Sequence, residues 1–561
     1  MPRVLKNCAV WTSLALAGAA AGQTQFRAVW ADAFSVGFKS ESQIQDMVAR
    51  AGAGNYNALI VEVLAFHDRT GSGHGAYWDS SIVPRATDVS GGIDPLQRVI
   101  DVAHAAGLEV HAWLVPYRVC SSWPPSGNSY LAAHPEHLMV PQADMGGGPA
   151  TVGGYFTLDP GSTEAQQYLV SIVQEIVGAY AIDGVNLDYI RYVQTDAGYP
   201  ADAGYARSSL QRFRDLTGYV GTPAPTGVTS WNNFRRQTIT ELVRRLRAEI
   251  ASIPNASQPL RFSADLICFG NAPTSFSSSD AYLLHQNWKL WMESGYLDMG
   301  IPMNYKREHI AAQATWYRNW VDAAIGWSGD RHIVAGQANY LNTKANSVTQ
   351  MAYAINAGTD GTCNFSYDAT ADENTNGTPE TDWTWYSYVA TNLFTTPAAT
   401  PPMPWRDPSQ ASEGTLWGRV IDDTTGAAVD GANVSVSGQP PTQTDGNGYY
   451  VVTLIPATAG GASYSVSASS DLCSAVNAPS VVVTAGGITR HDFTLCPTFA
   501  GPGDMDADGD IDFNDFNLLL FCHQGPDNTY AGGSFCLNGD ADFDDDIDLD
   551  DLAAFQLVYP Q

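Results

Sequence analysis

Positive charge is scarce in this chain of 561 residues, where 28 Lys and Arg stand against 58 Asp and Glu for a net charge of −30. A polyphosphate partner requires a basic face, so the composition argues against nucleic-acid binding. Residues 501–561 hold 15 aspartates and no Lys or Arg. We therefore expect this acidic tail to be a separate unit.

Long apolar runs are also lacking. No stretch after the N-terminus reaches the roughly 18 apolar residues that a membrane-spanning helix needs. The chain starts with a basic segment, Met1–Lys6, then an apolar one, Ala9–Ala17, then small residues, Ala19–Gly22. This order is typical of a signal peptide, predicted here as residues 1–22 and removed on export. We expect a secreted protein, extracellular or periplasmic, with no membrane span.

Cys-x-x-Cys and His-x-x-x-His spacings are absent, so the sequence gives no indication of a structural zinc site. Seven cysteines follow the predicted signal peptide, and an exported chain can form disulfides. Two candidate pairs, Cys473–Cys496 and Cys522–Cys536, each lie within one proposed module. The other three cysteines lie at the ends of proposed strands, and at least one of them stays free.

Between residues 25 and 395, short apolar runs alternate with amphipathic stretches. The predicted strands are Phe26–Phe34, Ala58–Phe66, Glu109–Tyr117, Gly184–Tyr192, Arg261–Gly270, Met299–Tyr305, His332–Tyr340 and Gly361–Tyr367. The predicted helices are Glu41–Ala53, Pro95–Ala106, Glu164–Tyr180, Trp231–Ile253, Tyr282–Glu293, His309–Ile325, Ser347–Ala357 and Thr381–Leu393. Apolar strands that are each followed by a helix favour the α/β class and a (β/α)8 TIM barrel. A doubly wound open sheet is the alternative, but no glycine-rich phosphate loop follows any strand.

In such barrels the chemistry lies at the carboxyl ends of the strands and in the loops that follow. The candidate catalytic carboxylates there are Asp188, Glu62, Asp265, Asp368 and Glu308. The candidate substrate-binding residues are Arg118, Tyr117, His111, Arg191, Tyr305 and Asn304. Carboxylates, arginines and aromatic rings around one cleft suit a neutral polyhydroxylated ligand, because sugars stack on rings and hydrogen-bond to charged groups.

Several blocks of this region resemble a known family. They are Phe26–Trp30, Asp94–Leu96, Gly107–Trp113, Pro116–Arg118, Leu158–Gly161 and Asp183–Tyr189, in that order. Together they resemble the glycosyl-hydrolase-like 10 family, bacterial TIM-barrel glycosidases that include a member acting on peptidoglycan glycan strands. The resemblance implies hydrolysis of glycosidic bonds. Two positions depart from the family pattern: Tyr189 follows Asp188 where a second Asp is frequent, and Glu62 stands where Gln is common.

Glycosidic cleavage needs two carboxylates, one ionised and one that holds a proton for the leaving oxygen. Our hypothesis makes Asp188 the nucleophile or base and places the acid among the other four candidates. Each of these acids also has a purely structural alternative, such as a salt bridge from Asp188 to Arg191. Two other functions stay open: a non-catalytic glycan-binding barrel, and a metal-dependent hydrolase that uses Glu62, His67 and His111.

Residues 396–413 are rich in Pro, Thr and Ser and read as an extended linker. Residues 414–496 alternate apolar and polar residues between Gly/Asp turns, which predicts a small β-sandwich. Gly418–Asp422, Gly431–Val434 and Thr444–Tyr449 resemble the carboxypeptidase regulatory-like domain, which implies a structural or spacer module.

The tail, residues 500–561, contains two acidic loops with carboxylates at the spacing of a Ca²⁺-binding loop. The expected ligands are Asp504, Asp506, Asp508, Asp510, Asp512 and Asp515 in the first loop, and Asp540, Asp542, Asp544, Asp546, Asp548 and Asp551 in the second. An apolar helix start follows each loop, so the pair resembles a type I dockerin. The resemblance implies calcium-dependent folding and docking to a cohesin-like scaffold or cell-surface protein. A self-contained calcium staple is the alternative, and no cofactor is expected in the barrel.

Overall fold

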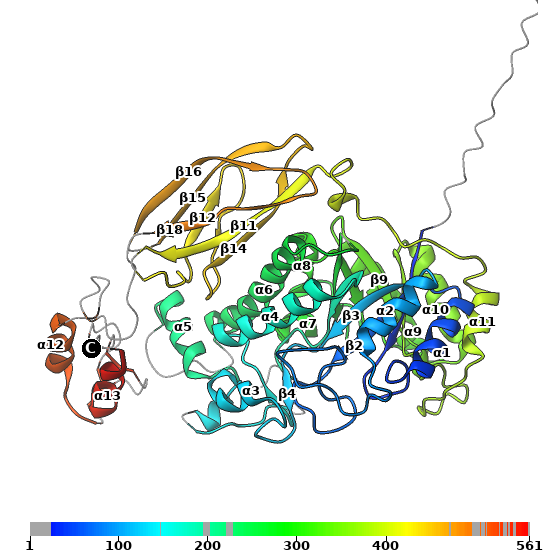
Figure 1. Cartoon of the computed structure of the whole chain (residues 1–561), viewed down its shortest axis with the longest axis horizontal. Helices are drawn as coiled ribbons and strands as arrows, with labels where there is room; N and C mark the ends of the chain where they lie inside the picture. The colour runs from blue at the N-terminus through cyan, green and yellow to red at the C-terminus, as the bar shows by residue number, and fades with distance from the viewer. Residues whose placement is uncertain are drawn as a thin grey trace, which may run out of the picture.

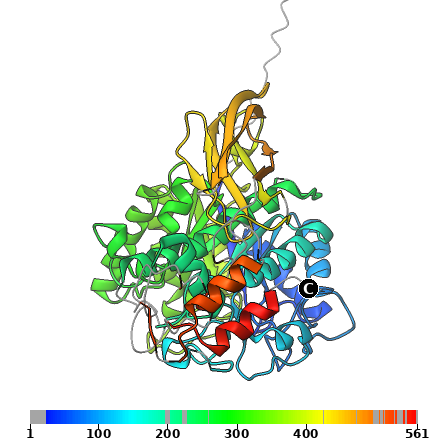
Figure 2. The ribbon, with the colours of Figure 1, turned by 90° about the vertical axis from the view of Figure 1, so that its left-hand side faces the viewer.

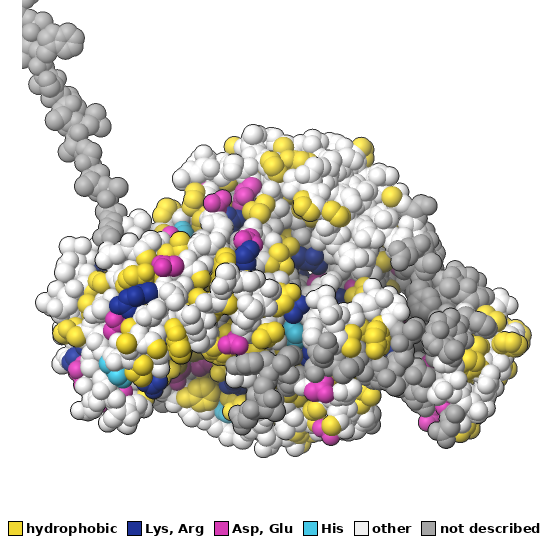
Figure 3. All heavy atoms as spheres, turned by 180° about the vertical axis from the view of Figure 1, so that it is seen from behind, with side chains coloured by type: hydrophobic (Ala, Val, Ile, Leu, Met, Phe, Trp, Pro, Cys, Tyr) yellow, Lys and Arg dark blue, Asp and Glu magenta, His cyan; other side chains and the backbone are white. Residues whose placement is uncertain are grey.

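The computed structural model describes residues 24–558 except 146, 195–201, 220–227, 258, 424, 471–472, 496–504, 506–510, 512, 527, 531–535, 537–538 and 542–545. A large body carries an all-β module, and two short helices lie near the C-terminus (Figure 1). Seen from behind, the surface has only scattered charged side chains (Figure 3), in line with a charged content of 15%. The predicted signal peptide lies outside the described residues. No helix in the described part of the chain has the length and apolar character to cross a bilayer.

Eight parallel strands close into a barrel in the order β1-β10-β9-β8-β7-β6-β3-β2. They are β1 (Phe26–Ala31), β2 (Ala58–Leu64), β3 (Glu109–Leu114), β6 (Gly184–Leu187), β7 (Arg261–Leu266), β8 (Met299–Pro302), β9 (His332–Ala338) and β10 (Gly361–Phe365). Every strand begins at its predicted residue and ends earlier than predicted, because the apolar composition continues into the loops beyond it. The predicted TIM-barrel architecture is confirmed.

Helices cover the outside of the barrel. They include α1 (Glu41–Ala53), α2 (Pro95–Ala105), α4 (Thr163–Ala179), α6 (Thr229–Ser252), α9 (Ala311–Gly326), α10 (Lys344–Ala357) and α11 (Trp385–Asn392). Side chains of Ser40, Asp94, Ser162 and Thr343 cap the first turns of α1, α2, α4 and α10 by accepting backbone N–H groups. Two further helices, α3 (Ser129–Ala133) and α5 (Arg207–Thr217), were not expected from the sequence.

The stretch expected as a single helix over Tyr282–Glu293 is instead two helices, α7 (Asp280–Leu283) and α8 (Trp288–Glu293). Gln286 lies between them and is fully buried. Its side chain accepts the N–H of Ile267 at 2.7 Å and donates to the carbonyl of Asp265 at 3.0 Å. These bonds hold the chain against the end of β7, and the helix is interrupted there.

The barrel interior is a packed core and not a pore. It is filled by a cluster of buried side chains: Phe26, Ala28, Trp30, Ala58, Ile60, Trp113, Met299, Ile301, Val334 and Cys363. These residues alternate with outward-facing ones along each strand, as the period of two requires. The same alternation decides which polar side chains project inward at the strand ends.

Residues 396–413, expected as an extended linker, pack against the amino-terminal side of the barrel. The N–H of Gln25 donates to the carbonyl of Ala399 at 2.9 Å. Arg261, the first residue of β7, donates to the carbonyl of Pro401 at 2.9 Å. Trp405 lies in the 3-10 turn η5 (Pro404–Arg406) and is buried. A composition that suits an extended chain is thus also compatible with a fixed path, because the segment's carbonyls and Trp405 find partners on the barrel.

The all-β module contains two four-stranded sheets, β14-β11-β17 with β18 beside β11, and β13-β12-β15-β16. The strands are β11 (Glu413–Asp422), β12 (Asn433–Val436), β13 (Thr442–Gln443), β14 (Tyr449–Pro456), β15 (Ala462–Ser470), β16 (Cys473–Val483), β17 (Ile488–Arg490) and β18 (Phe493–Leu495). They confirm the expected separate all-β module.

The all-β module rests on the helix layer of the barrel (Figures 1 and 2). Arg244 of α6 donates to the carbonyl of Gln443 at 2.9 Å, and the guanidinium of Arg245 lies 4.0 Å from the ring centre of Tyr449. Ala248 of α6 packs with Trp417 and Val451 of the sheet. The module is therefore a fixed extension of the barrel surface.

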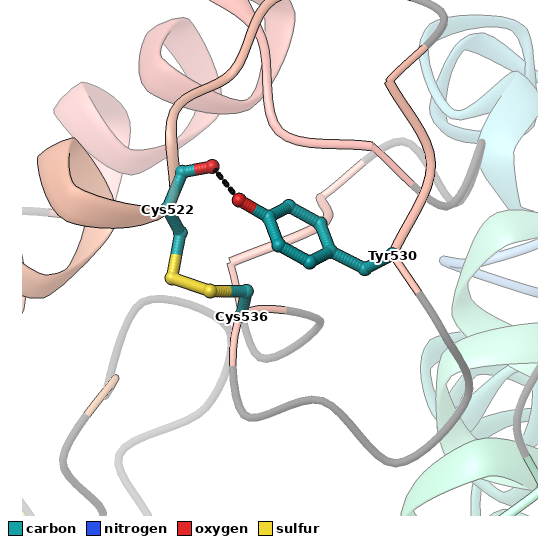
Figure 4. Close-up of a disulfide and its surroundings, with 3 residues drawn as sticks. All are labelled: Cys522, Tyr530 and Cys536. Carbon is teal, nitrogen blue, oxygen red and sulfur yellow. Dashed lines mark hydrogen bonds between the residues drawn. A yellow bond between two sulfur atoms is a disulfide. The ribbon is translucent and has the colours of Figure 1, made fainter.

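The tail contributes α12 (Phe513–Cys522) and α13 (Leu549–Val558). A disulfide joins Cys522 to Cys536, whose Cα atoms are 5.4 Å apart, and the hydroxyl of Tyr530 donates to the carbonyl of Cys522 (Figure 4). This candidate pair is confirmed. The other candidate pair includes Cys496, which lies outside the described residues. Cys120, Cys268 and Cys363 are free and buried.

Candidate active site

A cleft of about 710 Å³ lies at the carboxyl ends of the barrel strands. Charged and aromatic side chains from the ends of most strands line it. They include Asp32, Phe34, Glu62, Trp113, Arg118, Asp188, Tyr189, Arg191, Phe269, Tyr305, Tyr340, Phe365 and Asp368. The position agrees with the rule that barrel enzymes build their sites at this face.

Three buried carboxylates, Glu62, Asp188 and Asp265, interact electrostatically at this end of the barrel. Strand alternation explains their common direction. Glu62 comes two residues after Ile60 of the barrel core. Asp265 follows Ser263 at the same spacing, and Asp188 follows Asn186. Between Glu62 and Leu64 the pairing of β2 with β3 shifts register, an irregularity of the kind that re-aims side chains near active sites.

Glu62 is 4% exposed and its Oε2 accepts the N–H of Ala33 at 2.8 Å. Burial, helped by the charges of Asp32 and Asp188 and opposed by the Ala33 N–H and Arg118, raises the pKa of Glu62 to about 8. Glu62 is therefore protonated at neutral pH while it lines the cleft, which is the state that a general acid requires.

Asp188 directly follows β6 and is better supplied with partners for its charge. Its Oδ1 accepts the N–H of Tyr189 at 2.6 Å and lies 3.6 Å from a terminal nitrogen of Arg191. Burial raises the pKa of Asp188 above its usual range, although Arg191, the Tyr189 N–H and Arg118 oppose the shift. Asp188 thus has two arginines that favour its charged form, whereas Glu62 has only Arg118.

Asp265 is the deepest of the three carboxylates. It is 2% exposed and does not belong to the cleft lining, and Asn186 donates to its Oδ1 at 3.2 Å. Burial and the nearby charge of Asp188 raise its pKa well above the usual range. Asp265 is thus a buried neighbour of Asp188 whose surroundings favour its protonated form.

The guanidinium groups of Arg118 and Arg191 both stack on one aromatic ring, that of Tyr189. The two guanidinium carbons lie 4.4 Å and 4.1 Å from the ring centre of Tyr189. Tyr189 is 42% exposed and has a φ of 49°, a left-handed backbone that is uncommon for a bulky residue. The sequence hypothesis did not include Tyr189 among the site residues. Its place directly after Asp188 was the available signal.

Replacing Tyr189 by alanine is expected to raise KM about fivefold with a smaller change in kcat. The stack on two arginines contributes about 1 kcal/mol, and its loss frees both side chains, which are the expected substrate-binding arginines. Steady-state kinetics on a glycan substrate would measure this. Tyr189→Phe keeps the ring and should behave as wild type, so equal defects in both variants would contradict the stacking role.

Asp368 and Asp32 line another part of the cleft. Burial raises the pKa of Asp368, and the charge of Asp32 raises it further. The hydroxyl of Ser366 donates to Asp368 at 3.2 Å. Asp32, which the sequence hypothesis left out of the catalytic set, accepts the N–H of Phe34 at 3.0 Å. These two acids form a second, more exposed carboxylate pair.

Besides Asp265, four expected site residues do not line the carboxylate cleft. Glu308 pairs with Arg318 at 2.6 Å, and Asn304 donates to the carbonyl of Tyr317 at 2.8 Å. His111 is in the first half of β3, where its Nε2 lies 3.1 Å from Glu109. Tyr117 lines an adjoining cavity of about 270 Å³ that it shares with Arg118, Tyr189 and Arg191. Tyr305, by contrast, lines the cleft as expected.

The ligand set of the metal-dependent alternative does not assemble. The Nε2 of His67 lies 2.8 Å from the carbonyl of Pro116, and burial lowers the pKa of His67 to about 4. His111 lies near the opposite end of β3, next to Gly184 at the start of β6. In the described part of the barrel, Glu62, His67 and His111 therefore do not form one metal site.

Some of the expected calcium ligands lie in the described part of the tail. Asp546, Asp548 and Asp551 bring one carboxylate oxygen each to within 4.8 Å of the others. Both loops share one contact: Asp515 accepts the N–H of Met505 at 2.6 Å, and Asp551 accepts that of Ala541 at 2.5 Å. Asp540, at the start of the second loop, is buried. The remaining expected ligands lie outside the described residues: Asp504, Asp506, Asp508, Asp510, Asp512, Asp542 and Asp544.

Comparison with known proteins gives relatives for two regions. The sequence model of the family "Glycosyl hydrolase-like 10" matches residues 25–355, and that of the "Carboxypeptidase regulatory-like domain" matches residues 415–496. Over 244 residues the chain is 29% identical to "Glycosyl hydrolase DigH" of Escherichia coli (strain K12), covering 41% of this chain and 52% of the relative. It is 24% identical over 406 residues to "Glycosyl hydrolase YngK" of Bacillus subtilis (strain 168), covering 66% and 70%.

The chain thus spans about half the length of DigH. Among solved structures, the PgaB (BpsB) glycoside hydrolase domain from Bordetella bronchiseptica is similar with a TM-score of 0.45 and 14% identity, covering 62% of this chain and 99% of that one. The resemblances drawn from the barrel and β-sandwich motifs are confirmed by the two family matches. Because the first of these covers more than half of the 561 residues, the chain belongs to the glycosyl hydrolase-like 10 family.

Proposed function

We propose that the barrel is a glycoside hydrolase that cleaves O-glycosidic bonds of a polysaccharide or of peptidoglycan glycan strands with Glu62 and Asp188. The observation that carries the proposal is the contrast between the two acids in one cleft. Burial raises the pKa of Glu62 to about 8; burial also raises the pKa of Asp188, but Arg191, 3.6 Å away, and Arg118 oppose that shift and favour its charged form. Glycosidases need this division of one protonated and one ionised carboxyl group.

In the proposed reaction, Glu62 gives its proton to the glycosidic oxygen as the bond to the anomeric carbon breaks. The bonding electron pair leaves with that oxygen, and positive charge develops on the sugar. Asp188 stabilises this charge, either by attacking the anomeric carbon or by taking a proton from an attacking water. Product anomers measured by NMR distinguish the two routes, because the first retains and the second inverts the configuration.

The lining of the cleft supports a glycan as the substrate class. Phe34 is 49% exposed in the lining of the cleft, so it offers a ring face on which a sugar can stack. Arg118 and Arg191 offer hydrogen-bond donors at the same place. The names of the two relatives, both glycosyl hydrolases, point to the same class.

The test is a panel of glycans that includes peptide-free peptidoglycan strands and neutral polysaccharides. New reducing ends and shortened oligosaccharides would be identified by mass spectrometry for the wild type and for a Glu62→Gln/Asp188→Asn double variant. We expect products from the wild type alone. Glycan binding by folded wild type without any product would instead establish a non-catalytic glycan-binding barrel.

For the tail, we propose a dockerin-like calcium-binding unit that attaches the exported protein to a cohesin-like scaffold or a cell-surface protein. The repeated contact of Asp515 and Asp551 with a backbone N–H ten residues earlier supports two equivalent loops. Clustered carboxylates repel one another unless a cation lies among them, and oxygen ligands suit Ca²⁺.

Asp548→Ala is expected to remove one of two bound calcium ions, because Asp548 belongs to the carboxylate group of the second loop. Asp550→Ala is the matched control, since Asp550 is exposed and lies outside the ligand pattern. Isothermal titration of the calcium-free full chain would count the ions. Equal stoichiometry in the two variants would contradict the proposed ligand set. Glycan hydrolysis should continue in the presence of a calcium chelator, because none of the described tail residues lines the cleft.

A further inference from the structure

A second group of metal-ligating side chains lies outside the carboxylate cleft, in the long loop between β4 (Arg118–Cys120) and β5 (Phe156–Thr157). It consists of His134, which follows α3, and of Glu136 and His137 in the 3-10 turn η1 (Pro135–His137). One nitrogen of each histidine and one oxygen of Glu136 all lie within 4.8 Å of one another. The Nδ1 of His134 is already 2.7 Å from Oε1 of Glu136.

His137 has the environment of a metal ligand. It is 4% exposed, and its Nε2 lies 3.2 Å from the hydroxyl of Tyr130. Its Nδ1 is buried and has no hydrogen-bond partner among the described residues. Buried polar atoms without a partner are rare and call for an ion or a water molecule. In metal sites, the second ring nitrogen of a histidine ligand is usually held by an oxygen atom, as Tyr130 does here.

We propose that His134, Glu136 and His137 bind one Zn²⁺ ion. Two imidazoles and one carboxylate form a donor set that zinc favours, with bonds of about 2.0–2.2 Å. The rings of His134 and His137 stack with centres 5.0 Å apart, so binding requires the side chains of His134 and Glu136 to turn toward a common point. Both can turn, because they are 39% and 61% exposed. His137 stays fixed by burial and by Tyr130.

The ion would cross-link the end of α3 to η1 and so brace the loop between β4 and β5. This loop also carries Tyr155, whose ring lies 4.8 Å from the guanidinium of Arg118 at the cleft. The fourth coordination position would be open to water, because the cluster borders a cavity of about 860 Å³ that Tyr130 and Glu164 also line. The spacing His-x-Glu-His differs from the Cys-x-x-Cys and His-x-x-x-His spacings of structural zinc sites.

The experiment measures zinc bound to the full chain with calcium present in excess to occupy the tail. Metal-free protein would be dialysed against Zn²⁺, and bound zinc would be counted by mass spectrometry. Substitution by Co²⁺ would report the geometry through its visible absorption. We expect one zinc per chain, a tetrahedral Co²⁺ spectrum, and at least about tenfold weaker binding in His134→Gln and in Glu136→Gln.

His104→Gln is the matched control, because His104 also pairs with a carboxylate, Asp183, at 2.8 Å but belongs to no three-ligand group among the described residues. Its zinc affinity should equal that of the wild type. Absence of stoichiometric zinc would overturn the proposal, as would binding that His134→Gln and Glu136→Gln leave unchanged. Because both variants change exposed side chains, they should remain folded, which circular dichroism would verify.

Discussion

Glu62→Gln is expected to lower kcat by about 10²–10⁴-fold, because it removes the proton donor and keeps the shape of the side chain. Substrates with an activated aryl leaving group should suffer least, since they need little protonation. In the wild type, kcat/KM should fall as the pH rises through about 8, where Glu62 loses its proton. Rate profiles of both proteins on natural and aryl substrates would measure these effects.

The same substitution is expected to raise the free energy of unfolding. Measuring this gain also shows that the variant is folded. Folded Glu62 keeps its proton up to about pH 8, whereas a glutamate in the unfolded chain loses it near pH 4.3. Between these values the folded state binds more protons, so this group lowers the free energy of unfolding as pH rises. Glutamine does not titrate. The variant should therefore gain stability relative to the wild type from about pH 5 to about pH 9. If the variant lost the alkaline fall in kcat/KM but did not show this gain, the result would count against Glu62 as the acid.

Asp298→Ala is expected to lower the free energy of unfolding by about 3–5 kcal/mol, because it leaves buried arginines without their counter-charge. Asp298 is fully buried just before β8, 3.6 Å from Arg247, and it accepts Trp405 Nε1 at 2.7 Å and the N–H of Phe262 at 3.0 Å. This carboxylate joins the barrel, α6 and the segment that leads to the β-sandwich. Denaturant unfolding of the full chain would measure the change.

The charge state of Asp298 also gives this interaction a pH signature. Burial alone would raise its pKa, but Arg247, Arg406 and the two hydrogen bonds lower it to about 2. The stabilisation is therefore present above the unfolded value of about 4 and is lost as the pH falls towards about 2. Glu293→Ala, which breaks only the partly exposed pair with Lys289, should cost less than about 1 kcal/mol. Similar losses in the two variants would contradict the central role of Asp298.

Much of the barrel was predictable because hydrophobic periodicity is a local property. All eight strands start where the apolar runs start, and the strand-end rule already grouped Glu62 with Asp188. The prediction failed where a strand was extended too far. β8 ends at Pro302, so Asn304 and Glu308 lie in the following loop and turn to Tyr317 and Arg318.

Other features depend on contacts between distant segments, and the sequence alone could not supply them. Pro-rich composition indicated an extended linker, but Trp405 donates a hydrogen bond to Asp298, more than 100 residues earlier in the chain. His111 was grouped with the strand-end residues, although its third position in β3 places it far from the cleft. The stack of Arg118 and Arg191 on Tyr189 likewise arises only when the loops after β3 and β6 meet.

The most direct test of the proposed chemistry is the turnover of Asp188→Asn on the glycan that the wild type cleaves best. Asparagine keeps the size of the side chain and its bond from the Tyr189 N–H but cannot carry the negative charge that stabilises the developing cation. The account predicts a loss in kcat of about 10³-fold or more, with glycan binding retained. A folded Asp188→Asn protein that releases reducing ends at the wild-type rate would contradict it.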